Sequence, residues 1–326
     1  MMQTPSTGPA VVAAGGGHGL AATLRSLRRI TDDLTAIVGV ADDGGSSGRL
    51  RRDFDIVPPG DLRMALAALC GDDSWGRTWS RVIQHRFTGN GELSGHALGN
   101  LLIAALWEET RDIVTGLDWV GALLGAHGRV LPLSNQPLEI VASVRGLHPT
   151  DPVASTTIRG QVAVARTRGH VESVRLEPTD ATACPQAIDA VKSADALVIG
   201  PGSWYTSVLP HLLLPDMRDA WVAADALRIC ALNLAPQAGE TEHFHLHTHL
   251  DVLHEQIPEL TLDVVLADVG VVTDRSALER SARRLGATLE LMPLAEAPGV
   301  PQHNPDLFAA ALRSVLPARG QRGMAG

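Results

Sequence analysis

Two adjacent carboxylates and a cluster of hydrogen-bond donors follow the apolar run at residues 35–40. The segment reads Ala41-Asp42-Asp43-Gly44-Gly45-Ser46-Ser47-Gly48-Arg49. Its glycines allow a ligand to approach the backbone closely, and its hydroxyls, free N–H groups and guanidinium can donate to an anion. The segment therefore predicts a site for a polar ligand, with Mg²⁺ at Asp42 and Asp43 left open. The competing interpretation is a capped turn with solvated acids.

Two further glycine loops have the same donor chemistry. The first follows the apolar run 10–14 and precedes a predicted helix at 21–29, and the second follows the apolar run 196–199. A turn between a strand and a helix directs free N–H groups and the positive helix end at an anion. The candidate ligand contacts in these loops are Gly16, Gly17, His18, Gly19, Gly202, Ser203, Tyr205 and Thr206. A tight turn without a ligand is the alternative for the first loop, and packing is the alternative for Tyr205.

The first loop also satisfies the dinucleotide fingerprint G-x-G-x-x-A from Gly17 to Ala22. Asp42 lies about 20 residues further on, where that fingerprint places an acid. The hypothesis that the protein is a nicotinamide-dependent oxidoreductase rests on this match alone. The Gly-Gly after the two acids and the hydroxyl-rich second loop count against it.

Other polar residues stand at the predicted ends of strands and helices. Asp61 and Arg63 open a predicted helix that ends at Leu69, and Asn100 lies on a strongly apolar helix. Asp61 also fits as a helix cap, and Asn100 as a partner of a neighbouring loop. The strand at 228–232 is followed by Asn233, Gly239, Glu240 and Thr241. Because the carboxyl ends of parallel strands meet at one sheet edge, these loops are expected to converge on one ligand.

The alternation of buried strands and helices predicts an α/β fold with a mainly parallel, doubly wound sheet. Between about 129 and 178, short alternating strands, including 130–133 and 158–165, predict a small antiparallel β insert. We expect one domain over residues 1–318 and a disordered tail at 319–326.

Composition excludes several classes of protein. The chain has 326 residues, a net charge of −9 and no long basic stripe, which argues against nucleic acid as the main partner. No apolar stretch reaches the length of about 18 residues that a membrane span needs. Three widely spaced cysteines and an N-terminus without a signal pattern favour the cytoplasm. The four alternating histidines from His243 to His249 leave metal binding open, although no known zinc spacing completes them.

Six motifs taken together resemble the CofD-like superfamily, on the gluconeogenesis factor (YvcK-like) branch, over residues 10–315. They are Gly15–Leu20, Ala41–Arg51, Pro58–Arg63, Gly99–Leu102, Gly200–Ser207 and Gly239–Thr241. The resemblance implies a Rossmann-like three-layer α/β/α fold and a cytoplasmic bacterial protein that binds UDP-sugars, notably UDP-N-acetylglucosamine. It also implies a role in cell shape, cell-wall control and growth on gluconeogenic carbon sources. Protein partners in cell-wall regulation and a homo-oligomer are compatible with it.

The sister branch, 2-phospho-L-lactate transferase, joins a nucleotide-activated phospholactate to a deazaflavin with Mg²⁺. Its metal-binding acid corresponds to Asp42 or Asp43, and its nucleotide loop is similar to Gly200–Ser207. Two hypotheses follow: a nucleotide-sugar-binding regulator without turnover, and a transferase in which Asp42 and Asp43 hold Mg²⁺. For either, the sequence predicts that Asp43→Ala weakens ligand binding with little change in melting temperature.

This sequence departs from the family pattern at three points. His18 stands where relatives usually have threonine, Met64 replaces a common asparagine, and Gln302 stands where relatives often have arginine. His18 and Gln302 fall where UDP-sugar contacts are expected in relatives, so they affect ligand recognition rather than the fold.

Overall fold

The computed structural model describes residues 8–148, 150–151, 153–237 and 239–318. A seven-stranded sheet in the order β10-β9-β8-β7-β1-β2-β3 forms its centre, and every neighbouring pair in it is parallel. The strands are β1 (Val11–Gly15), β2 (Leu34–Val38), β3 (Arg129–Pro132), β7 (Ala196–Ile199), β8 (Leu227–Ala231), β9 (Val264–Asp268) and β10 (Thr288–Met292). This confirms the predicted mainly parallel, doubly wound α/β fold.

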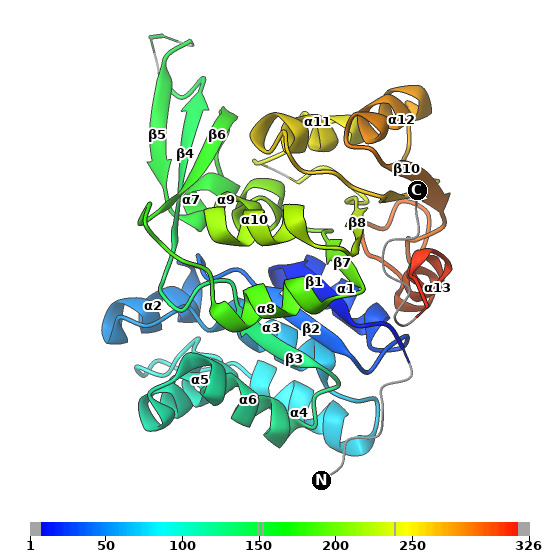
Figure 1. Ribbon diagram of the computed structural model, residues 1–326. Coiled ribbons are helices and arrows are strands. Elements are labelled where there is room, and N and C mark those ends of the chain that lie inside the picture. Colours follow the sequence, from blue (N-terminus) through cyan, green and yellow to red (C-terminus); the bar gives the residue numbers. More distant parts are fainter. Residues whose placement is uncertain (1–7, 149, 152, 238, 319–326) are drawn as a thin grey trace.

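Helices cover both faces of the sheet, as Figure 1 shows. Because right-handed crossovers run outward from β1 in one direction and from β7 in the other, their helices lie on opposite faces. One group contains α1 (Gly17–Leu27), α3 (Gly60–Leu69), α4 (Ser74–Gln84), α5 (Leu98–Thr110), α6 (Ile113–Leu124) and α13 (Pro305–Val315). The other contains α8 (Pro185–Ser193), α10 (Pro215–Ala223), α11 (Leu246–Gln256) and α12 (Arg275–Arg284). Strands β1, β7 and β9 are buried at every residue, as strands covered on both faces should be.

A second, three-stranded antiparallel sheet projects from the body (Figure 1). Its order is β5-β4-β6, with β4 at Glu139–Arg145, β5 at Ser155–Arg159 and β6 at His170–Glu177. The short helix α7 (Gln161–Ala165) lies between β5 and β6. The predicted antiparallel insert is thus present, and it begins near residue 139.

Two details of the expected insert are wrong. Residues 130–133 do not belong to it, because β3 pairs in parallel with β2 at the edge of the main sheet. Residues 161–165 form α7 rather than the second half of a strand. Apolar runs of four or five residues fit a buried strand and a helical turn equally well, so periodicity could not separate them. The predicted tail at 319–326 lies outside the described residues.

Three further helices follow strands β2 and β7 in the chain. The segment after Asp43 forms α2 (Gly45–Phe54), where a loop was expected, with Gly44 as its N-cap residue. After β7 come one π-helical turn, η1 (Trp204–Val208), and α9 (Pro210–Leu213). None of the helices within the described ranges is both long and apolar enough to cross a membrane.

Candidate functional site

The direction of winding reverses between β1 and β7, and the glycine loops that follow these strands touch each other. A Cβ atom placed on Gly19 would lie 2.1 Å from the carbonyl oxygen of Pro201. The Thr23 hydroxyl of α1 donates to the carbonyl oxygen of Gly200 at 3.0 Å. The two loops singled out in the sequence therefore form one structure at the switch point, where doubly wound sheets bind ligands.

A third loop, after β8, is clamped to the second. Asn233 donates from Nδ2 to the carbonyl oxygen of Gly202 at 2.8 Å and accepts from the Gly202 N–H at 2.8 Å. This two-point contact fixes the backbone of the Gly202 loop, and Asn233 is buried. The predicted convergence of loops after β1, β7 and β8 is thereby realised.

A cavity of about 490 Å³ opens between these loops and the C-terminal part of the chain. Its lining comprises His18, Gly19, Ala22, Arg25, Pro201, Gly202, Asn233, Leu234, Ala235, Pro236, Gln237, Glu296, Pro301, Gln302, His303 and Pro305. Cavities of this size hold ligands as large as a nucleotide. We call it the switch-point pocket.

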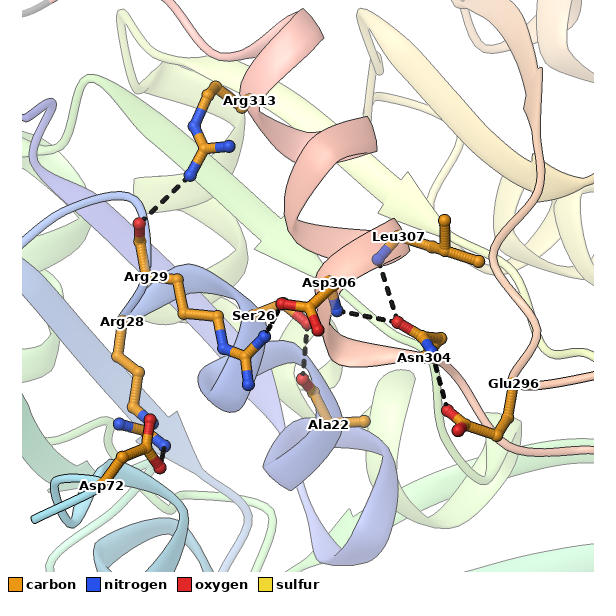
Figure 2. A network of polar contacts seen from close by, with 10 residues as sticks. All are labelled: Ala22, Ser26, Arg28, Arg29, Asp72, Glu296, Asn304, Asp306, Leu307 and Arg313. Atoms are coloured by element: carbon orange, nitrogen blue, oxygen red, sulfur yellow. Dashed lines mark hydrogen bonds and ion pairs between the residues drawn. The ribbon is translucent and has the colours of Figure 1, made fainter.

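Residues 296–305 supply part of the pocket lining, and Figure 2 shows the polar contacts that tie this wall and α13 to α1. Asn304 caps α13 by accepting the N–H groups of Asp306 (2.9 Å) and Leu307 (3.1 Å), and its amide donates to Glu296 at 2.9 Å. Arg29 on the C-terminal turn after α1 pairs with Asp306, and Arg313 donates to the Arg29 carbonyl oxygen at 3.1 Å. These contacts hold the wall in place against the helix that carries His18 and Arg25.

Arg25 is a pocket residue that the sequence reading missed. His18, Ala22 and Arg25 are spaced i, i+4, i+7 on α1, so they face the pocket as one stripe. Burial, followed by the charge of neighbouring Arg28, lowers the pKa of Arg25, yet guanidinium groups stay charged at neutral pH. The helical spacing from the predicted His18 contact was the signal that could have identified it.

A second cluster of predicted residues joins the N-termini of α2, α3 and α5. The Ser47 hydroxyl accepts the Gly60 N–H at 2.6 Å, and Asp42 accepts the Gly44 N–H at 2.9 Å. Asn100 accepts from Arg63 Nε at 2.8 Å and donates to the Ser46 hydroxyl at 3.0 Å. Arg63 and Asn100 are buried, so they fix the loops around Asp42. Arg49 donates away from this cluster, to the Ser94 carbonyl oxygen at 2.8 Å.

Asp61 connects this cluster to the first glycine loop. A Cβ atom placed on Gly16 would lie 2.6 Å from Asp61 Oδ2, and the Gly17 N–H is a hydrogen-bond donor to this carboxylate. Burial, and then the charge of Asp42, raises the pKa of Asp61 to about 7 against the opposing effects of Gly17 and Arg63. Burial also raises the pKa of Asp42. Two coupled carboxyl groups with raised pKa values are typical of functional sites.

The raised pKa of Asp61 predicts a pH-dependent stability. An aspartate in the unfolded chain has a pKa of about 3.9, so between about pH 4 and pH 7 only the folded state keeps this proton. By linkage, Asp61 therefore lowers the free energy of unfolding progressively as the pH rises from about 4 to about 7, and the full loss of stability is reached above about pH 7. Asp61→Asn removes the titration, so wild type should lose melting temperature relative to this variant between pH 5 and pH 8. Parallel melting curves against pH would refute the assignment.

Asp43 turns away from Asp42, toward the small sheet. Its Oδ1 accepts the Val162 N–H at 3.0 Å, and a Cβ atom on Gly160 would lie 2.2 Å from its Oδ2. Asp43 therefore caps α7 and ties the insert to the main sheet. The charge of Asp42 raises the pKa of Asp61, a neighbour that the sequence-based pairing of Asp42 with Asp43 did not include.

This contact changes the prediction for Asp43. We now expect Asp43→Ala to lower stability by about 1 kcal/mol, as removal of a helix cap does, because the Val162 N–H loses its acceptor. Asp43→Asn, which keeps an acceptor oxygen, should retain most of it. Thermal melting of both variants tests this, and an unchanged melting temperature for Asp43→Ala would restore the sequence-based expectation.

A divalent cation at Asp42 would need ligands from outside the chain. Within the described residues, no three His, Cys, Asp or Glu side chains are grouped closely enough to hold a metal ion. Mg²⁺ commonly combines one or two carboxylates with water and phosphate oxygens. Asp42 and Asp61 fit that use, with a phosphorylated ligand supplying the rest.

Glu240 occupies the predicted anion cradle of the second loop. Its Oε1 accepts the Tyr205 N–H at 2.7 Å, and the Ser203 hydroxyl donates to its Oε2. Thr206 also donates to this carboxylate, which is 6% exposed and whose pKa is raised by burial. The N-terminus of η1 thus already holds an anion from its own chain.

The remaining predicted residues near this loop support it rather than line the pocket. The Tyr205 side chain is 2% exposed, and its hydroxyl donates to the Val171 carbonyl oxygen at 3.3 Å. The Thr241 hydroxyl accepts the Gln237 N–H at 3.0 Å, and Gly239 packs on the backbone of α7. Tyr205 therefore follows the packing alternative, and stacking on a base is not available to it.

The histidine run divides between the surface and the core. His245 and His247 stack at 5.5 Å, whereas His249 is buried edge-on against Trp204 at 5.0 Å. Because the run enters α11 at Leu246, its side chains spread around a helix. The described residues give no support to a shared metal site here.

Fold and pocket together define a doubly wound α/β protein with a cavity between glycine loops at its switch point, which is a candidate ligand site. The chain belongs to the CofD family, because the family model described as 2-phospho-L-lactate transferase CofD matches residues 11–292. Within the family its relatives place it on the gluconeogenesis factor (YvcK-like) branch.

The chain is similar in sequence to two named relatives and in fold to one solved structure. A Mycobacterium tuberculosis (strain H37Rv) protein named "Putative gluconeogenesis factor" is 50% identical over 308 residues, which are 94% of this chain and 90% of that protein. The "Gluconeogenesis factor" of Listeria monocytogenes (strain EGD-e) is 35% identical over 325 residues, covering 95% and 97%. A crystal structure of a UPF0052 family member from Bacillus halodurans superposes with a TM-score of 0.82 at 32% identity, covering 94% and 99%.

Proposed function

We propose that this protein binds a UDP-sugar such as UDP-N-acetylglucosamine in the switch-point pocket and acts as a regulator of carbon and cell-wall metabolism. The observation that carries the proposal is the 490 Å³ cavity with the N-terminus of α1 at one side. The family model is named for 2-phospho-L-lactate transferase, and the resemblance to this branch, which uses a nucleotide-activated donor, supports a nucleotide-type ligand. Relatives named gluconeogenesis factor support a regulatory role.

The lining of the pocket suits the parts of a nucleotide. Backbone N–H groups at His18 and Gly19, with the positive end of α1, favour the diphosphate. The lining also includes Gln237 and Gln302, whose amides can both donate and accept, and the apolar rings of Pro236 and Pro301. A uracil ring, with its alternating donor and acceptors, fits such a lining.

Calorimetric titration with UDP-N-acetylglucosamine, with and without Mg²⁺, tests the proposal. Saturable binding followed by recovery of the intact nucleotide supports a regulator. Turnover of the nucleotide would favour a transferase, and absence of binding in both buffers would refute UDP-N-acetylglucosamine as the ligand.

Arg25 provides a prediction specific to this chain. Its guanidinium lies two helical turns from His18, where it can pair with the diphosphate or a neighbouring ligand oxygen. Arg25→Ala should weaken UDP-N-acetylglucosamine binding by about tenfold, the usual effect of losing one charge-assisted hydrogen bond. Arg81→Ala, an exposed substitution on α4, is the matched control and should bind as wild type does. Equal affinities for both variants would remove Arg25 from the site.

A transferase is the second candidate, and the effect of the Asp42 charge on Asp61, which puts two carboxyl groups in one cluster, favours it. In that reaction the two carboxylates would hold Mg²⁺ against phosphoryl oxygens, and buried Arg63 would stabilise negative charge. The donor would be a nucleotide-activated phospholactate and the acceptor a deazaflavin. Incubation with both substrates and Mg²⁺, followed by mass analysis for the joined product, tests this candidate directly.

A further inference from the structure

A second cavity, of about 560 Å³, lies between helices α11 and α12, and none of its lining residues belongs to the switch-point pocket. Its lining is His247, Asp251, Ala277, Arg280, Ser281, Arg283 and Arg284. Two helices supply every one of these side chains: His247 and Asp251 are spaced i, i+4 on α11, and the others come from α12. The groove is therefore built by two packed helices, not by loops.

The charge of this groove is positive in a protein whose net charge is −9. Asp251 pairs with Arg284 and neutralises that guanidinium. Neither Arg280 nor Arg283 has an ion pair or a side-chain hydrogen bond among the described residues; Glu279 feels the charge of Arg283 but pairs with Arg275 at 2.7 Å. Two guanidinium groups thus remain available at the groove.

The helix dipole explains this pattern only in part. Cations in the last turn of α12 stabilise the helix dipole, which accounts for Arg283 and Arg284. Arg280 lies outside that turn, and like Arg283 it has no carboxylate partner among the described residues. A bound anion would neutralise these two charges, and the cavity gives it a place.

We infer that the α11–α12 groove is a second ligand site, which binds a compact polyanion carrying phosphate or carboxylate groups. Arg280 and Arg283 provide planar forks of donors that match both kinds of oxyanion. The Ser281 and Arg284 side chains already hydrogen-bond each other at 3.1 Å, which orients the middle of the groove. His247, stacked on His245, closes the α11 side.

The test uses the whole chain and two probes, inorganic pyrophosphate and citrate, each titrated by calorimetry. The variant Arg280→Glu/Arg283→Glu reverses both available charges, and Arg81→Glu/Arg111→Glu makes the same change in net charge on α4 and after α5. Helices α4 and α5 lie far from α11 and α12, as Figure 1 shows. All four arginines are exposed, so melting temperatures should stay close to that of wild type.

Wild type and the control variant should bind at least one probe, and the groove variant should lose this binding event by 100-fold or more (about tenfold for each lost charged contact). Binding of pyrophosphate alone identifies a phosphate ligand, and binding of citrate alone a carboxylate ligand. The inference is overturned if neither probe binds wild type, or if the groove variant binds as wild type does. UDP-N-acetylglucosamine binding is expected to be the same in the groove variant and in wild type, so failure here and failure of the proposed function are distinguishable.

Discussion

Replacing Gly19 by alanine should weaken ligand binding strongly and destabilise the fold at the switch point. The new Cβ atom would lie 2.1 Å from the Pro201 carbonyl oxygen, 2.7 Å from the Pro201 carbonyl carbon and 2.8 Å from Gly202 Cα. These are backbone atoms, so no side chain can rotate to make room and the two loops must separate. Overpacking of this kind costs about 1 to 3 kcal/mol of stability. A displacement of about 1 Å in a positioned site commonly costs about 100-fold, which is the loss expected in UDP-N-acetylglucosamine affinity.

Gly91→Ala is the matched control for this substitution. A Cβ atom on Gly91 would meet no other atom within 4 Å, and its backbone does not require positive φ. Calorimetry and thermal melting of the two variants separate the contact at Gly19 from the general effect of losing a glycine. If Gly19→Ala melts and binds like Gly91→Ala, the loops are not held together at this contact.

The architecture could be predicted because its signals are local. Strands β1 and β7 are continuous apolar runs and β2 and β8 are mostly apolar, and each is followed by glycine or polar residues, so a mainly parallel, doubly wound sheet follows from the pattern. The convergence of the Gly19, Gly202 and Asn233 loops then follows from the geometry of a doubly wound sheet.

The partners of individual side chains could not be predicted, because they depend on contacts between distant segments. Asp42 and Asp43 are adjacent in the chain, yet the charge of Asp42 acts on Asp61, whereas Asp43 caps α7 by accepting from Val162, 119 residues away. Successive side chains in an extended segment point in opposite directions, which the pairing of the two acids as one metal site did not take into account. Gly202 and Glu240 were both assigned to the ligand, but the sequence contains no indication that Glu240 would fill the cradle itself.

Replacing Glu240 by alanine should have the second largest effect. Whether ligand binding becomes weaker or tighter shows if Glu240 supports the second loop or competes with the ligand's phosphate. The buried carboxylate satisfies the Tyr205 N–H at 2.7 Å and the hydroxyls of Ser203 and Thr206. Each buried donor left without an acceptor costs about 1 to 3 kcal/mol, so the melting temperature should fall clearly. Because Ser203 follows the clamped Gly202, loosening of η1 should also weaken UDP-N-acetylglucosamine binding, by about tenfold or more.

Glu240→Gln is the control that separates the charge from the hydrogen bonds. Its amide keeps an acceptor oxygen for the Tyr205 N–H, and its NH₂ group can donate to the Ser203 hydroxyl once that group rotates. If Glu240 acts as an internal support, Glu240→Gln should retain most of the stability and affinity that Glu240→Ala loses. If the ligand's phosphate instead displaces Glu240, both variants should bind UDP-N-acetylglucosamine more tightly than wild type, because a competing anion has been removed. Tighter binding would assign the phosphate to the Gly202 loop, and weaker binding in Glu240→Ala alone would leave the N-terminus of α1 as the diphosphate site.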